Sequence, residues 1–314
     1  MMIFFPMITP PVMWACLGIY GFLIIVQIIF FLGSKWKPNS KFSDMSARLR
    51  AWWYIFIAFT LVFLTRVWVL DLFWMGISLL ALREYFHVIP INPEHKRTKI
   101  WLYLSIPLQY ACILLNWYGL FLIFIPVYIY FLFPIRMILS GSSKHFLQSL
   151  GGFFWGIMMT GYSLSYVAYL SHLAIEKQYI AGPLGLLLYL LFITEMNDAM
   201  QYLWGKFLGR RLILPKISPK KTIEGLIGGV LSSICFSLLI APFLTPMNWV
   251  GAILMGGLIS IGGFFGDVTF SAIKRDVHIK DFGKILPGHG GLLDRIDSLI
   301  FTAPLFFHLI RWFY

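Results

Sequence analysis

A polar stretch near the carboxyl end carries the residues best suited to chemistry. The chain has 25 Lys and Arg and 13 Asp and Glu, and ten of these lie among the 31 residues from Asp267 to Asp297. The acids are Asp267, Asp276, Asp281, Asp294 and Asp297, and the bases are Lys274, Arg275, Lys280, Lys284 and Arg295. Carboxylates supply the hard oxygen ligands of Mg²⁺, and cationic side chains bind phosphate. The stretch therefore predicts a metal–phosphate site, with salt bridges such as Asp281 with Lys284 or Asp294 with Arg295 as the alternative for any one pair.

The spacing of these residues indicates two helical arms joined by a turn. A helix places residues three, four, seven or eight apart on one face, and this spacing is shared by Asp267, Ser271, Lys274, Arg275 and His278. Asp294 and Asp297 are three apart, so they also share a face. Between the arms lies the sequence PGHGG, from Pro287 to Gly291, whose glycines would let backbone N–H groups approach an anion.

A second polar block runs from Asn197 to Gly225. Asp198 lies at the cytoplasmic end of the span 181–202, with Glu195 one turn earlier, and SPKKTIEG (218–225) offers hydroxyl, ammonium and carboxylate groups. Ser218 or Thr222 would cap the following helix, because each stands shortly before an apolar run. Helix capping and the excess of basic residues on cytoplasmic loops explain part of this block. A phosphate-binding role is the alternative.

The composition shows which elements must position these residues. The chain has 314 residues, a mean hydropathy of +0.81 and 12% charged residues, against about 25% in a soluble domain. These values predict an all-α polytopic integral membrane protein with nine or ten transmembrane helices. No Lys or Arg precedes Lys35, so the basic start of a secretory signal is missing. The predicted apolar spans are 11–33, 50–65, 68–87, 99–116, 118–136, 149–172, 181–202, 226–243, 249–270 and 297–313.

The distribution of basic residues predicts the topology. If the ten spans alternate in direction, 22 of the 25 Lys and Arg fall on one side, and only Arg66, Lys177 and Arg311 fall on the other. Cytoplasmic loops carry the excess of Lys and Arg. Both termini are therefore expected outside, and the two richest polar loops (203–225 and 271–296) are expected to share the cytoplasmic face. We divide the chain into N-terminal transmembrane helices (1–180) and C-terminal helices that carry the catalytic motif (181–314).

The stretch from Ser271 to Asp297 resembles the pattern of the phosphatidate cytidylyltransferase (CDP-diacylglycerol synthase) family. That pattern is Ser-x-apolar-Lys-Arg, four residues, Lys-Asp, a proline/glycine turn, His-Gly-Gly and Asp-Arg-apolar-Asp. Its fixed positions are met by Ser271, Lys274, Arg275, Lys280, Asp281, Gly283, Pro287, His289, Gly290, Gly291, Asp294, Arg295 and Asp297. The segments 198–209, 218–225 and ALREYF (81–86) also look like this family. One departure is Asp198-Ala199-Met200-Gln201-Tyr202, where members often have Asp-Thr-Gly-Ala-Tyr, and it puts the lipid acceptor in question.

The resemblance implies a nucleotidyltransferase of phospholipid biosynthesis that transfers CMP from CTP to phosphatidate, giving CDP-diacylglycerol and pyrophosphate. We hypothesise that Asp267, Asp294 and Asp297 hold Mg²⁺, with or without a second cation, because hard carboxylate oxygens suit this ion. The implied catalytic residues are Asp267, Lys274, Arg275, Lys280, Asp281, His289, Asp294, Arg295 and Asp297. The implied substrate-binding residues are Asp198, Ser218, Lys220, Lys221, Thr222, Glu224, Ser271, Gly290 and Gly291.

The expected partners are CTP, phosphatidate in the cytoplasmic leaflet and the lipid bilayer. A homodimer is expected from the resemblance alone, and a bacterial inner membrane is the expected location. The alternative function is a CTP-dependent transferase or kinase that acts on another lipid, such as a polyprenol. A transporter would place its charges near mid-membrane, often in repeated halves, and neither feature is found. A nucleic-acid-binding role is excluded, because the basic residues are distributed as the membrane topology predicts. They form no basic stripe on a soluble domain.

Overall fold

The structure is a computed structural model that describes residues 9–36, 53–54, 56–173, 175, 179–283 and 290–314. Helices dominate it, which confirms the all-α polytopic membrane fold. The helices are α1 (Pro10–Trp36), α3 (Val67–Val88), α4 (Thr98–Leu114), α5 (Tyr118–Ile123), α6 (Tyr130–Ile138), α7 (Phe146–Ile157), α8 (Leu164–Tyr169), α9 (Gly182–Leu208), α10 (Ile223–Leu244), α11 (Trp249–Asp276) and α12 (Leu293–Phe313). Short 3₁₀ turns form η1 (Pro93–His95) and η4 (Leu170–His172), and π-helical segments form η2 (Phe124–Ile129) and η3 (Met158–Ser163).

The described part of each predicted apolar span is helical, apart from residues at the span ends. Within the described ranges, five helices are long and apolar enough to cross a membrane: Pro10–Ile29, Tyr118–Ile138, Ile223–Leu244, Trp249–Asp276 and Leu293–Phe313. The remaining spans are more polar or shorter. For example, α3 contains buried Asp71 and Glu84, and α4 has 17 residues. Buried polar groups inside such a bundle are expensive and therefore warrant a functional explanation.

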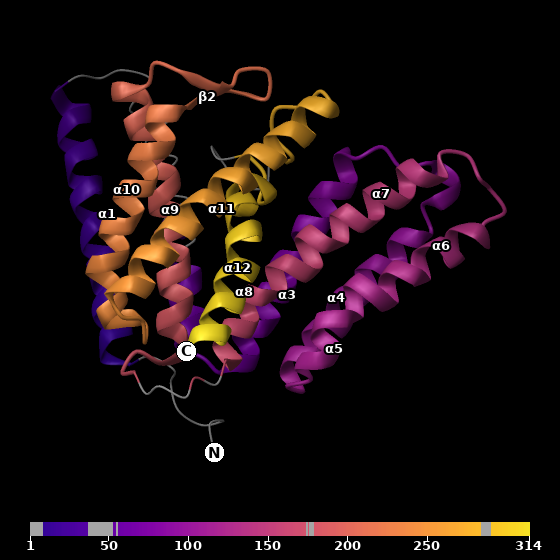
Figure 1. Cartoon of the computed structure of the whole chain (residues 1–314), viewed down its shortest axis with the longest axis horizontal. Coiled ribbons are helices and arrows are strands. Elements are labelled where there is room, and N and C mark those ends of the chain that lie inside the picture. Colours follow the sequence, from indigo (N-terminus) through magenta and orange to yellow (C-terminus); the bar gives the residue numbers. More distant parts are fainter. Residues whose placement is uncertain (1–8, 37–52, 55, 174, 176–178, 284–289) are drawn as a thin grey trace.

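The last four helices alternate in direction, in agreement with the topology prediction. Figure 1 shows α9 and α11 rising towards the β2 strand at the top, whereas α10 and α12 descend from it. The start of α1 and the end of α12 both lie at the bottom of this view. We call the top of this view the hairpin end and the bottom the opposite end. The charged segments that follow α9 and α11 therefore share the hairpin end.

Close packing brings the last four helices together. A Cβ atom on Gly266 of α11 would lie 2.6 Å from the Asp297 carbonyl oxygen of α12, so only glycine allows these backbones to approach. Gly256 of α11 lies equally tightly against the Ser233 and Ile234 backbone of α10. The division at residue 180 falls before α9, but α12 also packs against α8 and α3, so the two halves share an interface.

A small hairpin connects α9 to α10. Strand β1 (Leu212–Leu214) pairs with antiparallel β2 (Ser218–Thr222), with Leu212 opposite Thr222. The Thr222 hydroxyl accepts a hydrogen bond of 3.1 Å from the Gly225 N–H, which confirms the predicted cap of α10. Arg275 at the end of α11 donates from Nε to the Ile217 carbonyl oxygen at 3.2 Å. The hairpin is therefore fixed beside the two polar arms.

Candidate active site

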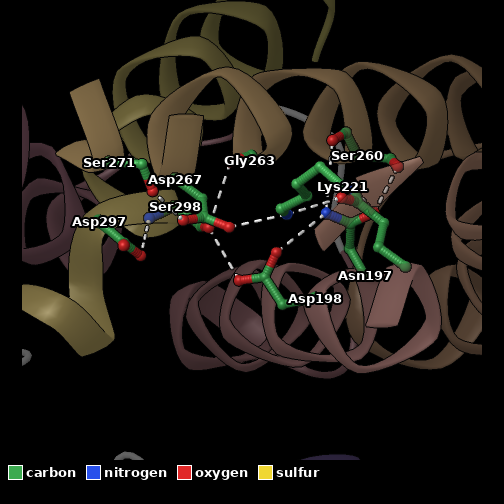
Figure 2. Close-up of polar contacts among 10 residues, drawn as sticks. Asn197, Asp198, Lys221, Ser260, Gly263, Asp267, Ser271, Asp297 and Ser298 are labelled. Carbon is green, nitrogen blue, oxygen red and sulfur yellow. Dashed lines mark hydrogen bonds and ion pairs between the residues drawn. The ribbon is translucent and has the colours of Figure 1, made fainter. Parts of the chain in front are cut away.

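Three helices and the hairpin bring acidic and basic side chains around one cleft at the hairpin end. Asp198 comes from α9, Asp267 from α11, Asp297 from α12 and Lys221 from β2. Figure 2 shows Asp267 facing Lys221, with Asp198 reaching towards them from α9. The cleft has a volume of about 270 Å³ and is lined by Asp198, Gln201, Tyr202, Lys220, Lys221, Asp267, Lys274, Asp281, Asp294, Arg295 and Asp297.

Lys221 is the best-held cation in the cleft. Its Nζ lies 2.7 Å from Asp267 Oδ2 and donates to Gln201 Oε1 at 3.0 Å. The other Asp267 oxygen accepts from the Ser271 hydroxyl at 3.3 Å, which confirms that these residues share a helical face. An ammonium group has three N–H donors, and these contacts use two of them. The ammonium group also lies 5.4 Å from the centroid of the Phe264 ring, and Lys221 lines the cleft.

Asp198 and Asp297 form no ion pair with any of the described residues. Asp198 accepts from the Ser298 hydroxyl at 2.8 Å and from Asn197 Nδ2 at 3.4 Å. Asp297 is 7% exposed and accepts from the Ser298 N–H at 2.8 Å. Asp297 is buried and Asp198 half-buried, and carboxylates held in this way only by neutral donors attract a cation, because removal of a charge from water is costly unless the charge is compensated.

Asp294 holds the loop between the two arms. One oxygen accepts from Lys274 Nζ at 2.9 Å, and the other accepts from the N–H groups of Phe282 and Gly291 at 2.8 and 3.1 Å. The expected alternative, a pair with Arg295, is replaced by this pair with Lys274. Its role as a metal ligand stays a prediction, but these contacts give Asp294 a positioning role of its own.

Glu84 completes the loop from the other half of the chain. This α3 residue is 5% exposed, and its oxygens accept from the N–H groups of Leu292 at 3.0 Å and Leu293 at 2.8 Å. A carboxylate at a helix N-terminus satisfies free N–H groups and complements the helix dipole. Gly283 and Gly291 pack directly against this carboxylate, where a Cβ atom would collide with it. Glu84 is not among the site residues predicted from the sequence, where the ALREYF segment was its only signal.

Several predicted substrate-binding residues shape the hairpin instead of lining the cleft. Thr222 caps α10, as described above. One Glu224 oxygen accepts from the backbone N–H groups of Arg210 at 2.9 Å and Arg211 at 3.2 Å. Ser218 opposes Leu214 in the sheet. Lys220 and Lys221 do line the cleft, so the SPKKTIEG segment combines a structural and a ligand-facing role.

The remaining predicted residues divide in the same way. Asp281 and Arg295 line the cleft, whereas Lys280 is exposed and is not among the lining residues. Gly290 has a φ of +84°, a conformation that favours glycine, and lies beside Asp281 and Asp294. His289 lies outside the described residues. Gln201 and Tyr202 line the cleft but are absent from the predicted site set.

The donors in the cleft fit Mg²⁺. Among the side chains that the structure describes, no group of three or more His, Cys, Asp or Glu is arranged to hold a metal ion alone. Protein Mg²⁺ sites usually need only one or two carboxylates, with substrate phosphates and water as the other ligands. Asp267 and Asp297 offer such oxygens on adjacent helices. The cleft can therefore combine a divalent cation with a phosphate chain.

The chain matches the model of the Cytidylyltransferase family over residues 46–313. It is 46% identical to the uncharacterized protein YnbB of Escherichia coli over 94% of this chain and 96% of that protein. It is 44% identical to a phosphatidate cytidylyltransferase of Synechocystis over 41% of this chain and 44% of the relative. It is also 35% identical to a phosphatidate cytidylyltransferase of Aquifex aeolicus over 56% of this chain and 64% of the relative. The chain thus spans less than two thirds of these two relatives, although it covers nearly all of YnbB.

Proposed function

The chain belongs to the cytidylyltransferase family, and from that premise we propose that it transfers CMP from CTP to phosphatidate. A phosphate oxygen of phosphatidate would form a new bond to the α-phosphorus of CTP. The bond from that phosphorus to the bridging oxygen would break, and pyrophosphate would leave with its electron pair. The products would be CDP-diacylglycerol and pyrophosphate.

The observation that carries this proposal is the cleft at the hairpin end, where cationic and acidic side chains meet at the ends of membrane-spanning helices. Lys220, Lys221, Lys274 and Arg295 all line it. A lipid phosphate at the membrane edge and a soluble nucleotide would both reach such a place. The names of the Synechocystis and Aquifex relatives support phosphatidate as the acceptor.

The reaction mainly requires that phosphate charge is neutralised and that the two substrates are positioned. A phosphate oxygen is already anionic near neutral pH, so the attack needs no strong general base. Lys221, whose ammonium group is held at the cleft by Asp267 and Gln201, would bind a phosphate oxygen, and Lys220 and Arg295 would neutralise further charge. Asp267 and Asp297 would hold Mg²⁺, with Asp198 beside them. When bound, Mg²⁺ would supply electrostatic stabilisation of the phosphate oxygens.

The proposed setting is the bacterial inner membrane, with the hairpin end in the cytoplasm. Basic residues at this end, such as Arg210 and Arg211 beside the hairpin and Arg275 in the last turn of α11, support this orientation, because cytoplasmic loops carry the excess of Lys and Arg. CTP would then reach the cleft directly, and phosphatidate would enter from the cytoplasmic leaflet. A homodimer remains a proposal from the family resemblance.

The test is an assay of the purified full-length protein in detergent micelles with CTP, Mg²⁺ and phosphatidate. We expect equal amounts of pyrophosphate and CDP-diacylglycerol. The matched control omits phosphatidate and should release no pyrophosphate. Product with another lipid phosphate, and none with phosphatidate, would contradict the proposed acceptor. Release of CDP with a polyprenol would instead support the kinase alternative.

A further inference from the structure

Gln201 has no role in the mechanism proposed above, although it lines the cleft. It lies on α9 and is 4% exposed. Its Oε1 accepts from Lys221 Nζ at 3.0 Å, and its Nε2 donates to Asn197 Oδ1 at 2.9 Å. Gln201 therefore links the best-held cation of the cleft to the interior of the helix bundle.

Asn197 anchors this link to three helices. It is fully buried on α9. Its Oδ1 accepts from the hydroxyls of Ser260 on α11 and Ser233 on α10, and its Nδ2 donates to the Ser260 carbonyl oxygen at 3.3 Å. Figure 2 shows Asn197 and Ser260 on the side of Lys221 away from Asp297. Buried networks in which every polar atom has a partner are rigid.

The two ends of the network fix the orientation of both amides. Lys221 can only donate, so it requires the oxygen of Gln201. The Ser260 carbonyl can only accept, so it requires the nitrogen of Asn197. The Gln201 nitrogen then donates to the Asn197 oxygen, so the amide orientations required at the two ends are consistent with each other. A glutamate at 201 could still accept from Lys221, but it could not donate to Asn197 when ionised.

We propose that Gln201 is a positioning residue that holds the Lys221 ammonium group towards the cleft for a substrate phosphate, an inference that rests on the proposed function. Asp267 holds the same ammonium group from α11, so Gln201 and Asp267 together restrict it from two helices. Gly229 of α10 packs directly against the Gln201 side chain, where a Cβ atom would collide with it. The site is therefore shaped for a long side chain at position 201, where the family pattern often has alanine.

A double-mutant cycle tests this role in the full-length protein. Gln201→Met keeps the length of the side chain against Gly229 but removes both hydrogen bonds, and Lys221→Met removes the ammonium group. We expect Gln201→Met to lower kcat about 10-fold, as for loss of a hydrogen bond to a charged group. We expect Lys221→Met to lower it about 100-fold. The double variant should match Lys221→Met within about twofold, because Gln201 acts only through Lys221.

The matched control is Gln109→Met, which removes another buried amide. Gln109 is fully buried on α4, and its Nε2 donates to the Phe121 carbonyl oxygen at 3.1 Å. It should leave kcat within about twofold in both backgrounds. Thermal stability and elution volume of every variant show whether it folds, and Gln201→Ala provides a second truncation.

Two results would overturn the inference. The first is a Gln201→Met protein with wild-type kcat. The second is a double variant that loses a further 10-fold below Lys221→Met, because independent effects would then add. If the wild-type protein forms no CDP-lipid, the proposed function fails separately. The same cycle is then measured as affinity for pyrophosphate, where coupling between Gln201 and Lys221 supports the inference and additivity overturns it.

Discussion

Buried acids occur at both ends of the helix bundle, but their surroundings differ. At the opposite end, Asp71 of α3 lies 2.8 Å from His172 Nε2, and its side chain is 1% exposed. At the hairpin end, buried Asp297 lines one cleft together with half-buried Asp198 and Asp267 and with Lys221. The first acid has its own partner within the bundle, whereas the second group has more negative charge than its ion pairs compensate.

The difference shows that a buried charge does not by itself mark a catalytic site. Asp71 Oδ1 and Trp74 Nε1 are both buried without a hydrogen-bond partner among the described residues, so this region also contains unsatisfied groups. What distinguishes the hairpin end is that acids from three helices line a space that a ligand can enter. We therefore expect substitutions at the hairpin end to affect turnover, and substitutions at Asp71 to affect mainly stability.

The largest effect is expected from Asp297→Asn. This change keeps the shape of the side chain but removes a charge that would hold Mg²⁺ beside the phosphates. We expect turnover to fall about 100-fold or more, as when a main electrostatic group is removed from an active site. CDP-diacylglycerol formation measures it. Asp276→Asn is the control, because Asp276 is exposed at the end of α11. Equal losses in both variants would contradict the metal assignment.

A smaller loss is expected from Glu84→Ala, which removes the acceptor for the Leu292 and Leu293 N–H groups. Two buried donors then lose their partner, at a cost of roughly 1–3 kcal/mol each. We expect lower thermal stability and about 10-fold slower turnover, because the start of α12 carries Asp294 and Asp297. Thermal unfolding and the product assay measure the two effects. Glu94→Ala, at an exposed glutamate, should change neither.

Gly283→Ala tests the same contact from the loop side. The added Cβ would collide with the Glu84 carboxylate, and overpacking of this kind costs roughly 1–3 kcal/mol. We expect stability to fall and turnover to drop several-fold. Gly18→Ala is the control, since a Cβ there meets nothing within 4 Å. Unchanged unfolding temperature in Gly283→Ala would show that Glu84 does not hold the loop as described.

The smallest effect on turnover is expected from Asp71→Ala. The variant leaves half-buried His172 without its carboxylate partner, so the free energy of unfolding should fall by roughly 1–3 kcal/mol. Turnover of the folded protein should stay within about twofold, while Asp71→Asn, which keeps an acceptor for His172, should lose less stability. A large loss of turnover in both variants would remove the distinction between the two ends of the bundle.

Sequence reasoning could predict the elements and the local contacts. The apolar spans predicted the helices, the i and i+4 spacing predicted the contact of Asp267 with Ser271, and the Thr222 cap followed from its place before an apolar run. The contacts between distant segments could not be predicted. Glu84 meets Leu293 across 209 positions, and nothing in the local pattern indicates which helix end it caps.

The roles of individual acids also depended on the fold. The role of Asp294 as a metal ligand stays a prediction, but its contacts with Lys274 and two backbone N–H groups come from the folded loop and could not be read from its spacing to Asp297. Gln201 looked like a departure from a family pattern, and only its contacts with Lys221 and Asn197 show what it does. Charge and spacing therefore indicated the region of the site, whereas partner choice required the packing of four helices.

The most direct test measures which phosphate of CTP is transferred to lipid. Wild-type, Asp297→Asn and Asp71→Asn proteins are incubated with Mg²⁺, phosphatidate and CTP that carries ³²P at either the α or the γ position. We expect only the α label to enter lipid with the wild-type and Asp71→Asn proteins. We expect Asp297→Asn to transfer about 100-fold less of this label. Transfer of the γ label to lipid, or equal transfer of the α label by all three proteins, would contradict this expectation.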